Sequence, residues 1–290
     1  MWWIATLGLG LMALAGTPEG ASAQQMLQEP DRPPPSRCLA LAQAAPAIMH
    51  ASYGGSILPA QAASPEVTIR FVGHATFLIT TPEGVTIATD YDGWAGGIAP
   101  RVVTMNRAHS GHNTPDPDPA IEHVLRGWNP EGGPARHNIA VDDVVIRNVP
   151  TDLRSFGFSD DGPGADGPGR MADGNSIFIF EVAGLCIGHL GHLHHLLEPA
   201  DLGWIGQLDV VMVPVDGTYT LAQTDMAKVL DLLKARLVLP MHYFTASNLQ
   251  RFIGVLSAEE YEVVLSPTAE TTISVATLPE RPTVLVLPGN

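Results

Sequence analysis

Basic residues are scarce in this sequence, and their scarcity excludes several partners. Lys and Arg together number 15 against 30 Asp and Glu, which gives a formal net charge of -15 over 290 residues. Such an excess of negative charge repels the phosphates of nucleic acids and the headgroups of anionic lipids. We therefore expect a small molecule, and no nucleic acid, as the partner, and we predict nothing about the oligomeric state.

Long apolar segments are also absent, except near the first residue. Residues 4–15 are apolar but too few to span a bilayer comfortably, and the small residues Ala21, Ser22 and Ala23 follow them. This pattern predicts a signal peptide over residues 1–23, cleaved on export to the periplasm or the medium. No Lys or Arg lies near the start, so an uncleaved N-terminal anchor is the alternative. After cleavage, no segment of about 20 apolar residues remains to hold the protein in a membrane.

Cysteine occurs only twice, as Cys38 and Cys186. In an oxidising compartment these two thiols can form one disulfide. Cys186 lies in an apolar stretch that is expected to be a buried strand, where a reduced cysteine is equally consistent. The sequence therefore leaves the pairing open.

Beyond the predicted signal peptide the chain divides into an extension and one folded domain. Residues 24–65 are rich in Pro, Ala and Gln, which favours an extended linker. We place the folded domain at residues 66–290. A chain of this length can fold around one large hydrophobic core. The short apolar segments within residues 67–89 predict an antiparallel meander. Residues 118–128 then carry apolar side chains at helical spacing, which predicts a helix.

Glycine and proline concentrate in residues 155–175, which contain six Gly and two Pro. This stretch is predicted to be a long loop, and such a loop inside a domain commonly acts as a lid. Apolar strands and amphipathic helices alternate after it, with the helices at residues 220–236 and 245–256. Because each half of the domain runs from strands into alternating strands and helices, we expect two sheets packed face to face with helices outside.

Several of the eleven histidines follow predicted strands. His109 and His112 come after the apolar residues 101–105, and His192 and His242 each follow a later apolar run. Ligand-binding side chains of sheet proteins gather where strands end, and neutral imidazole is the commonest protein ligand for zinc. We therefore predict a metal site formed by His109, His112, His192 and His242. The His-x-x-His spacing of the first two lacks the Glu of an HExxH helix and is weak evidence by itself.

Longer stretches of the sequence resemble a known family. Residues 67–90, VTIRFVGHATFLITTPEGVTIATD, resemble the opening strands of metallo-β-lactamase-fold hydrolases, in particular the branch that includes ascorbate-6-phosphate lactonase. Residues 185–221 and 235–244 are similar to that branch too. The resemblance covers roughly Val67 to Leu256. It implies an α/β fold, a metallo-β-lactamase-like αββα sandwich with two mixed β-sheets packed face to face and helices outside.

The resemblance also shows where this sequence departs from the family. Family members carry His-x-His-x-Asp-His after the strand that here is residues 101–105. The matching positions in this chain are Arg107, His109, Gly111 and His112. One histidine and one aspartate that bind metal in the family are thus lost.

Three further ligand positions follow later in the chain. The family aspartate that bridges two metals is matched by His192, and the family's last histidine ligand is matched by His242. Its middle histidine should lie near the end of the strand at residues 144–154, where Asp152 is the only ligand-type side chain. Because two divalent ions need a bridging anion between them, these changes favour one divalent metal, zinc before Fe, Ni or Mn.

The resemblance implies that three more side chains lie next to the metal ligands. His74 matches the histidine of the family's opening GHAT stretch, and Asp90 matches the aspartate that closes its third strand. His195 matches a family histidine just past the bridging position. For His74 and Asp90, a hydrogen bond that ties strands together is the alternative.

Arg107 and Asp152 are the candidate catalytic residues. The guanidinium of Arg107 cannot bind a cation but can hold a carboxylate or phosphate of the substrate, whereas pairing with acids at the surface is the alternative. Asp152 can orient or deprotonate a water, or simply accept a backbone hydrogen bond at a strand end.

The sequence thus predicts an exported metal-dependent hydrolase of a small ester, lactone or phosphoester. A water activated by a single metal ion would be the nucleophile, and Arg107 would suit an anionic substrate. The alternative is a catalytically silent relative that binds a metal or a small anionic ligand, because a fold does not decide the chemistry.

Overall fold

The structure, a computed structural model, describes residues 36–39, 64–154 and 169–289. The predicted signal peptide, most of the extension and residues 155–168 of the predicted lid lie outside the described residues. Everything described belongs to the unit formed by residues 33–290. No helix within the described ranges is long and apolar enough to cross a membrane.

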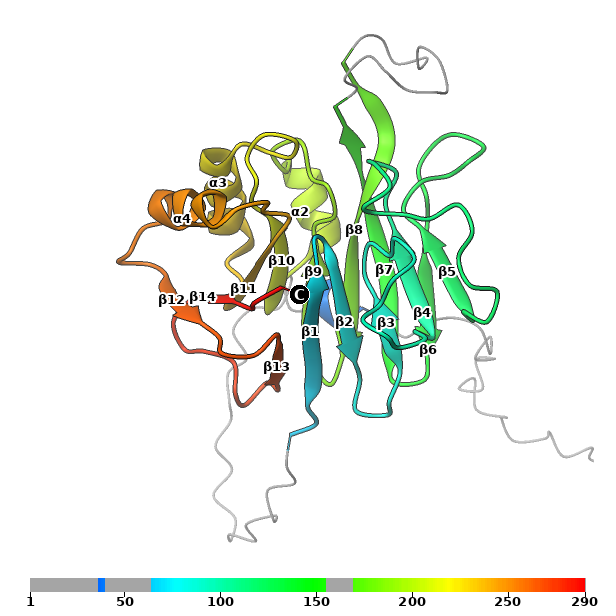
Figure 1. Cartoon of the computed structure of the whole chain (residues 1–290), viewed down its shortest axis with the longest axis horizontal. Coiled ribbons are helices and arrows are strands. Elements are labelled where there is room, and N and C mark those ends of the chain that lie inside the picture. The colour runs from blue at the N-terminus through cyan, green and yellow to red at the C-terminus, as the bar shows by residue number, and fades with distance from the viewer. Residues whose placement is uncertain (1–35, 40–63, 155–168, 290) are drawn as a thin grey trace, which may run out of the picture. The chain divides into compact units, whose positions relative to one another are not determined.

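Two mixed β-sheets form the fold, as predicted (Figure 1). The first has six strands, in the spatial order β13 (Glu270–Ile273), β1 (Val67–Gly73), β2 (Thr76–Thr80), β3 (Thr86–Ala88), β4 (Val102–Met105) and β5 (His123–Arg126). Strands β1, β2 and β3 are antiparallel, which confirms the predicted meander, and β4 and β5 continue the sheet in parallel. Burial alternates along β1, where Val67, Ile69 and Phe71 face the other sheet.

The second sheet has eight strands, in the order β12 (Glu262–Leu265), β14 (Thr283–Val286), β11 (Leu237–Met241), β10 (Val210–Pro214), β9 (Leu185–His189), β8 (Met171–Val182), β7 (Val144–Leu153) and β6 (Asn138–Val141). Strands β6 to β9 are antiparallel, whereas β9, β10, β11, β14 and β12 are parallel. The parallel strands β9, β10 and β11 are buried along their whole length, as continuous apolar runs require.

Within residues 169–289, three helices cover the outer face of the second sheet. They are α2 (Pro199–Ile205), α3 (Gln223–Leu233) and α4 (Ala246–Val255). The predicted apolar face of α3 is confirmed, because Met226, Val229, Leu230 and Leu233 are buried in a core with the strands of that sheet. A separate core lies between the two sheets.

The helix predicted at residues 118–128 is wrong. Residues His123–Arg126 instead form β5, which pairs with β4 in parallel register. Short apolar segments fit both helical and strand spacing, and here the open edge of β4 supplies hydrogen bonds that a lone short helix would lack. In the described chain, the outer face of the first sheet is covered by a core of loop residues such as Tyr91 and Ile121.

The predicted loop at residues 155–175 is also wrong at its end. Residues 171–175 belong to β8, which pairs with β7 down to the partners Leu153 and Met171. Gly174 fits there because a Cβ on it would lie 2.8 Å from the side chain of Leu153. A glycine therefore marks a close approach within the strand and not a break.

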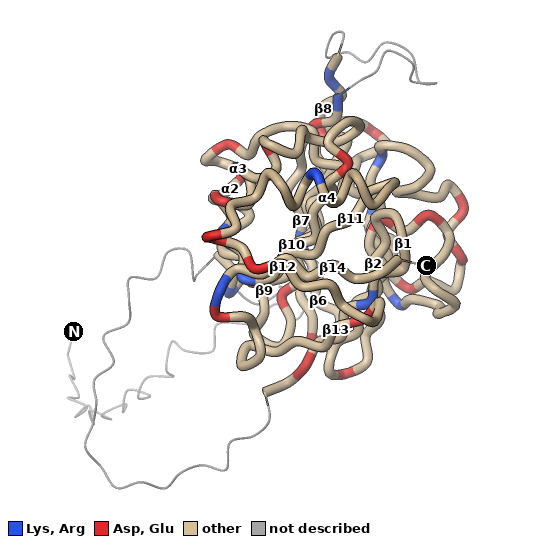
Figure 2. The backbone as a smooth tube through the Cα atoms, turned by 60° about the vertical axis from the view of Figure 1, so that its left-hand side comes forward, with Lys and Arg blue, Asp and Glu red and all other residues tan. Residues whose placement is uncertain are grey.

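Cys38 and Cys186 form a disulfide that ties a segment of the extension to β9. The same segment is held by Glu181 of β8, whose carboxylate accepts hydrogen bonds from Ser36 Oγ (2.5 Å) and from the backbone N–H of Arg37 (2.8 Å). Figure 2 shows Asp and Glu spread around the fold with few Lys and Arg, in keeping with the net charge.

Candidate metal centre

Five histidine rings lie against one another where four segments of the chain turn or end. They come from the β1–β2 turn, the loop after β4, the loop after β9 and the residue after β11, and they are His74, His109, His112, His192 and His242. Both His74 and His242 adopt a left-handed backbone, with φ of 50° and 54°. Non-glycine residues seldom take this conformation, and where they do it is concentrated at functional sites.

Three of the rings form the middle of the cluster. The ring centroid of His112 lies 4.5 Å from that of His109 and 5.1 Å from that of His242. His74 lies 4.2 to 5.4 Å from each of these three rings, and His192 lies 4.7 to 5.1 Å from each. No ring contact joins His74 to His192 among the described residues, so these two rings flank the middle three on opposite sides.

The ring nitrogens are arranged as metal ligands are. The ligand atoms of His74, His109, His112 and His242 all lie within 4.8 Å of one another. The Nε2 atoms of His109 and His242 are 3.4 Å apart, and two nitrogens on a tetrahedral zinc are separated by about 3.4 Å. This group contains three of the four predicted ligands, with His74 in the place of His192.

Several of these nitrogens are buried without a partner. Nε2 of His74, His112 and His192 makes no hydrogen bond to the described part of the chain. A buried polar atom without a partner is costly, and a metal ion at the centre of the group would satisfy those that carry a lone pair. Burial, followed by the neighbouring histidines, lowers the pKa of His74 to about 4 and that of His112 well below its usual range. The rings are therefore neutral near pH 7, the form that binds a metal.

Asp90 holds the ring of His112. Its Oδ2 lies 2.5 Å from His112 Nδ1, and its Oδ1 accepts a hydrogen bond from Asn106 Nδ2 (2.8 Å). Burial raises the pKa of Asp90 to about 6. A carboxylate on Nδ1 keeps the proton there and leaves the lone pair of Nε2 for a metal.

Asp216 lies beside His242 and was not among the residues predicted from the sequence. Asp216 Oδ1 lies 3.1 Å from His242 Nδ1, an ion-pair distance without the alignment of a hydrogen bond. The other oxygen, Oδ2, accepts the backbone N–H groups of Thr218 (2.8 Å) and Tyr219 (2.6 Å). Burial alone would raise the pKa of Asp216, but these contacts hold it well below its usual range. Asp216 comes two residues after the end of β10 (VVMVP). The strand-end criterion that selected the histidines would therefore have found it.

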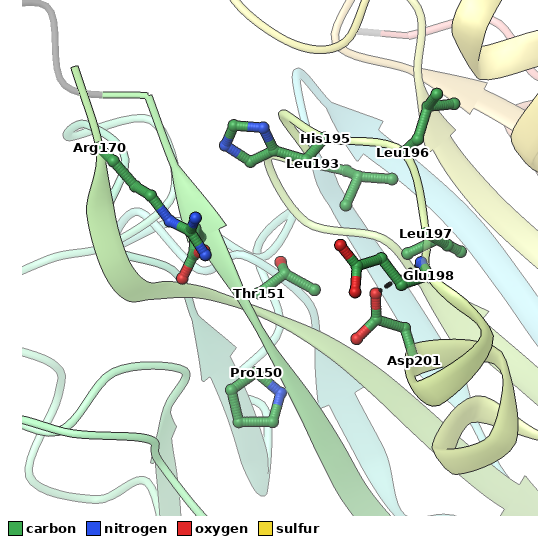
Figure 3. Close-up of a pocket in the computed structure, with 10 residues that line it drawn as sticks. Pro150, Thr151, Arg170, Leu193, His195, Leu196, Leu197, Glu198 and Asp201 are labelled. Atoms are coloured by element: carbon green, nitrogen blue, oxygen red, sulfur yellow. Dashed lines mark hydrogen bonds and ion pairs between the residues drawn. The ribbon is translucent and has the colours of Figure 1, made fainter.

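His194 contacts His192, whereas His195 does not. His194 Nε2 lies 2.6 Å from His192 Nδ1. His195, the neighbour for which the sequence implied a place beside the ligands, is exposed and faces a pocket of about 250 Å³ (Figure 3). The HLHH run gave no means of choosing between these two adjacent histidines.

The same pocket contains Asp152. Its carboxylate pairs with Arg170 and accepts a hydrogen bond from the backbone N–H of Asp173 (2.9 Å). Leu193, the neighbour of His192 in the chain, lines the pocket as well. Asp152 thus lies outside the group of candidate ligand atoms, and its carboxylate already has two partners. Arg107, two residues past β4, is half-buried, and its backbone N–H donates to the carbonyl of Gly174 (3.2 Å).

Residues 68–242 match the β-lactamase superfamily domain family. A UPF0173 metal-dependent hydrolase of Methanoregula boonei is 26% identical over 188 residues, which are 61% of this chain and 82% of that protein. A UPF0173 metal-dependent hydrolase of Thermococcus onnurineus is 25% identical over 232 residues, 69% of this chain and 97% of that protein.

A solved structure is similar as well. A Thermotoga maritima protein, assigned as a Zn-dependent hydrolase of the metallo-β-lactamase superfamily, aligns with a TM-score of 0.52 and 28% sequence identity. The alignment covers 77% of this chain and 100% of that one.

Proposed function

The chain belongs to the β-lactamase superfamily, and from this premise we propose that it is a metal-dependent hydrolase of a small ester, lactone or phosphoester that works with one divalent ion. The observation that carries the proposal is the set of four histidines whose ligand atoms lie within 4.8 Å of one another. In our proposal His109, His112, His242 and His74 hold the ion. Zinc suits this all-imidazole set best, with Fe, Ni or Mn as alternatives.

A bound divalent ion supplies a Lewis acid and lowers the pKa of a coordinated water to about 7. The chain's own residues prepare the site for that chemistry. Asp90 fixes the ring of His112 and Asp216 lies beside that of His242, and burial lowers the pKa of His112 and keeps its ring neutral. All four proposed ligands are uncharged, so the full charge of the ion remains available to polarise a substrate oxygen.

One ion, and not two, is favoured by the absence of a bridging carboxylate in the described group. The two positions at which the sequence lacks an expected acid are Gly111 and His192. The space beside Gly111 is taken by the ring of His74, because a Cβ there would lie 2.8 Å from His74 Nε2. Two divalent ions about 3.5 to 4 Å apart repel each other strongly and need an anion between them.

Two exposed aromatic rings favour a substrate with an apolar part. Phe244 is 56% exposed, yet its ring lies 5.3 Å from that of His242 and 5.9 Å from that of His74. Tyr219 is 57% exposed and lies edge-on to Phe244 at 5.8 Å. Large apolar side chains at the rim of a polar site gain free energy when a ligand covers them. Arg107 remains our candidate for holding a negatively charged substrate group.

The disulfide supports export, because such bonds persist in oxidising compartments. We accordingly propose a periplasmic or secreted enzyme whose N-terminal residues 1–23 are removed.

Elemental analysis of the purified chain, followed by a panel of p-nitrophenyl esters, lactones and phosphoesters, tests the proposal. We expect one tightly held ion per chain and turnover that stops when a chelator removes it. Two ions per chain would overturn the single-metal assignment. One ion without any turnover would favour the catalytically silent relative.

A further inference from the structure

A hydrogen-bonded chain of three groups ends at His192. The backbone N–H of Arg154 donates to Nδ1 of His194. Nε2 of His194 lies 2.6 Å from Nδ1 of His192. Nε2 of His192, at the far end, is buried, and its ring lies 4.7 Å from that of His112 and 4.8 Å from that of His242.

The backbone N–H of Arg154 fixes the direction of these hydrogen bonds. A backbone N–H can only donate, so Nδ1 of His194 must accept. A neutral imidazole carries one proton, which in His194 is therefore on Nε2 and is donated to Nδ1 of His192. The proton of His192 is then on Nε2, which points into the cluster. Because each ring accepts a hydrogen bond at Nδ1, it carries a single proton and is neutral.

His112 and His242 have the opposite arrangement. Their Nδ1 atoms face the carboxylates of Asp90 and Asp216, which accept and do not donate. The Nε2 atom of His112, whose Nδ1 is hydrogen-bonded to Asp90, consequently carries a lone pair. The partner on the outer nitrogen thus distinguishes His192, with its proton on Nε2, from His112, with its lone pair there.

We propose that His192 does not bind the metal but donates a hydrogen bond from Nε2 to the substrate oxygen that becomes negative during hydrolysis. The identity of that oxygen rests on the proposed function. The position of the proton on His192 does not. His192 makes no covalent bond and gives up no proton in this role. His194 is a positioning residue that sets the tautomer of His192. A donor aimed at a developing oxyanion is worth about 100- to 1,000-fold in kcat.

The position of the proton can be observed without activity. Long-range 1H–15N correlation spectra of the metal-free, full-length chain report which ring nitrogen of each histidine is protonated. We expect the proton of His192 on Nε2, and that of His112 on Nδ1 as the internal comparison. A proton on Nδ1 of His192 would overturn the proposal.

Variants then separate a donor from a ligand. We expect His192→Ala to retain one zinc ion per chain, with kcat and kcat/KM reduced equally, by about 100-fold or more. His112→Ala should instead lose the metal. Loss of the metal from His192→Ala would show that His192 is a ligand, and the proposal would fall.

Two substitutions at His194 test the relay. His194→Gln keeps an N–H that can donate to His192 Nδ1, whereas His194→Phe removes it. In His194→Gln we expect His192 to keep its proton on Nε2. In His194→Phe we expect the proton of His192 to be distributed between Nδ1 and Nε2. An identical His192 tautomer in both would show that His194 does not set it. If no substrate is turned over by the wild type while the spectra and the metal content are as expected, the hydrolase proposal fails but the assignment of His192 as a donor stands.

Discussion

A Cβ atom on Gly111 would lie 2.8 Å from Nε2 of His74, so the ring of His74 fills the space that a side chain at residue 111 would need. His74 lies in the β1–β2 turn and has a left-handed backbone, which directs its ring toward the other histidines. The carbonyl of His74 also accepts the backbone N–H of His242 (2.7 Å), which fixes the turn beside another proposed ligand. The ring of His74 can therefore lie beside the other histidines only because residue 111 is a glycine.

The first prediction concerns this contact. Gly111→Ala should displace the His74 ring and weaken zinc binding by about 10- to 100-fold, the usual effect of disturbing one metal-site contact. His74→Ala should weaken it by a similar factor. Because both changes act on the same ring, the double variant should be little worse than either single one. Competition with a chelator of known affinity measures all three.

Gly254→Ala is the matched control, since a Cβ on this glycine of α4 meets nothing within 4 Å. It should leave zinc affinity unchanged. Effects of Gly111→Ala and His74→Ala that simply add would contradict the prediction, because they would show that residue 111 acts independently of His74.

A second prediction concerns the two buried carboxylates. Asp90→Asn and Asp216→Asn should each reduce zinc affinity by about 10- to 100-fold, because His112 loses the acceptor that fixes its tautomer and His242 loses the negative charge beside its Nδ1. Asp216→Asn should also lower the unfolding midpoint, because the Asp216 carboxylate accepts the backbone N–H groups of Thr218 and Tyr219. Calorimetric zinc titration measures the affinities. Wild-type affinity in both variants would show that the carboxylates serve only the fold.

The sequence predicted the two sheets because their strands are short, apolar and bounded by turns, as in β1 to β3 and in β9 to β11. It missed α2 and β14, which are short and carry no strong periodicity. It also made a helix of β5, because four residues are too few for the helical and strand periods to differ. Pairing with β4 decided that element, and pairing is not visible in a single sequence.

The candidate site was predictable as far as each ligand could be placed on a strand end. His109, His112 and His242 satisfied that rule and lie in the group of ligand atoms. His74 lies close to these ligands because Gly111 has no side chain. The two residues are 37 positions apart, and only folding brings them together. In the same way, the direction of the hydrogen bond from His194 to His192 depends on a backbone N–H that lies 40 residues away in the sequence.

A third prediction concerns the exposed ring of Phe244. Phe244→Ala should lower kcat/KM for p-nitrophenyl benzoate by about tenfold relative to p-nitrophenyl acetate, the scale of one lost aromatic contact. Trp204→Ala removes another exposed aromatic side chain, 68% exposed on α2, and should leave the ratio of the two substrates unchanged. An unchanged ratio in Phe244→Ala would remove this ring from the substrate site.

The fourth prediction concerns the disulfide, which closes a loop with a sequence separation of 148 residues. Replacing both Cys38 and Cys186 with Ala should lower the free energy of unfolding by about 3 to 5 kcal/mol, because the unfolded chain regains the freedom of a long loop. Urea unfolding of metal-free protein measures the difference, and reduced wild type is the comparison. A stability equal to that of the oxidised wild type would show that the bridge constrains little.

The last prediction is the pH dependence of the metal-free protein. Burial lowers the pKa of His74 to about 4 and lowers those of His109 and His112, whereas an unfolded histidine titrates at about 6.5. Between these values the unfolded chain binds more protons than the folded chain, so stability should fall as the pH drops from about 6.5 toward 4. Asp90, with its pKa raised to about 6 by burial, acts in the opposite direction, but it is one group against several histidines. Urea unfolding in the presence of a chelator should therefore give a lower midpoint at pH 5 than at pH 7.5. A higher midpoint at pH 5 would mean that the histidines of the empty cluster are already protonated in the folded chain.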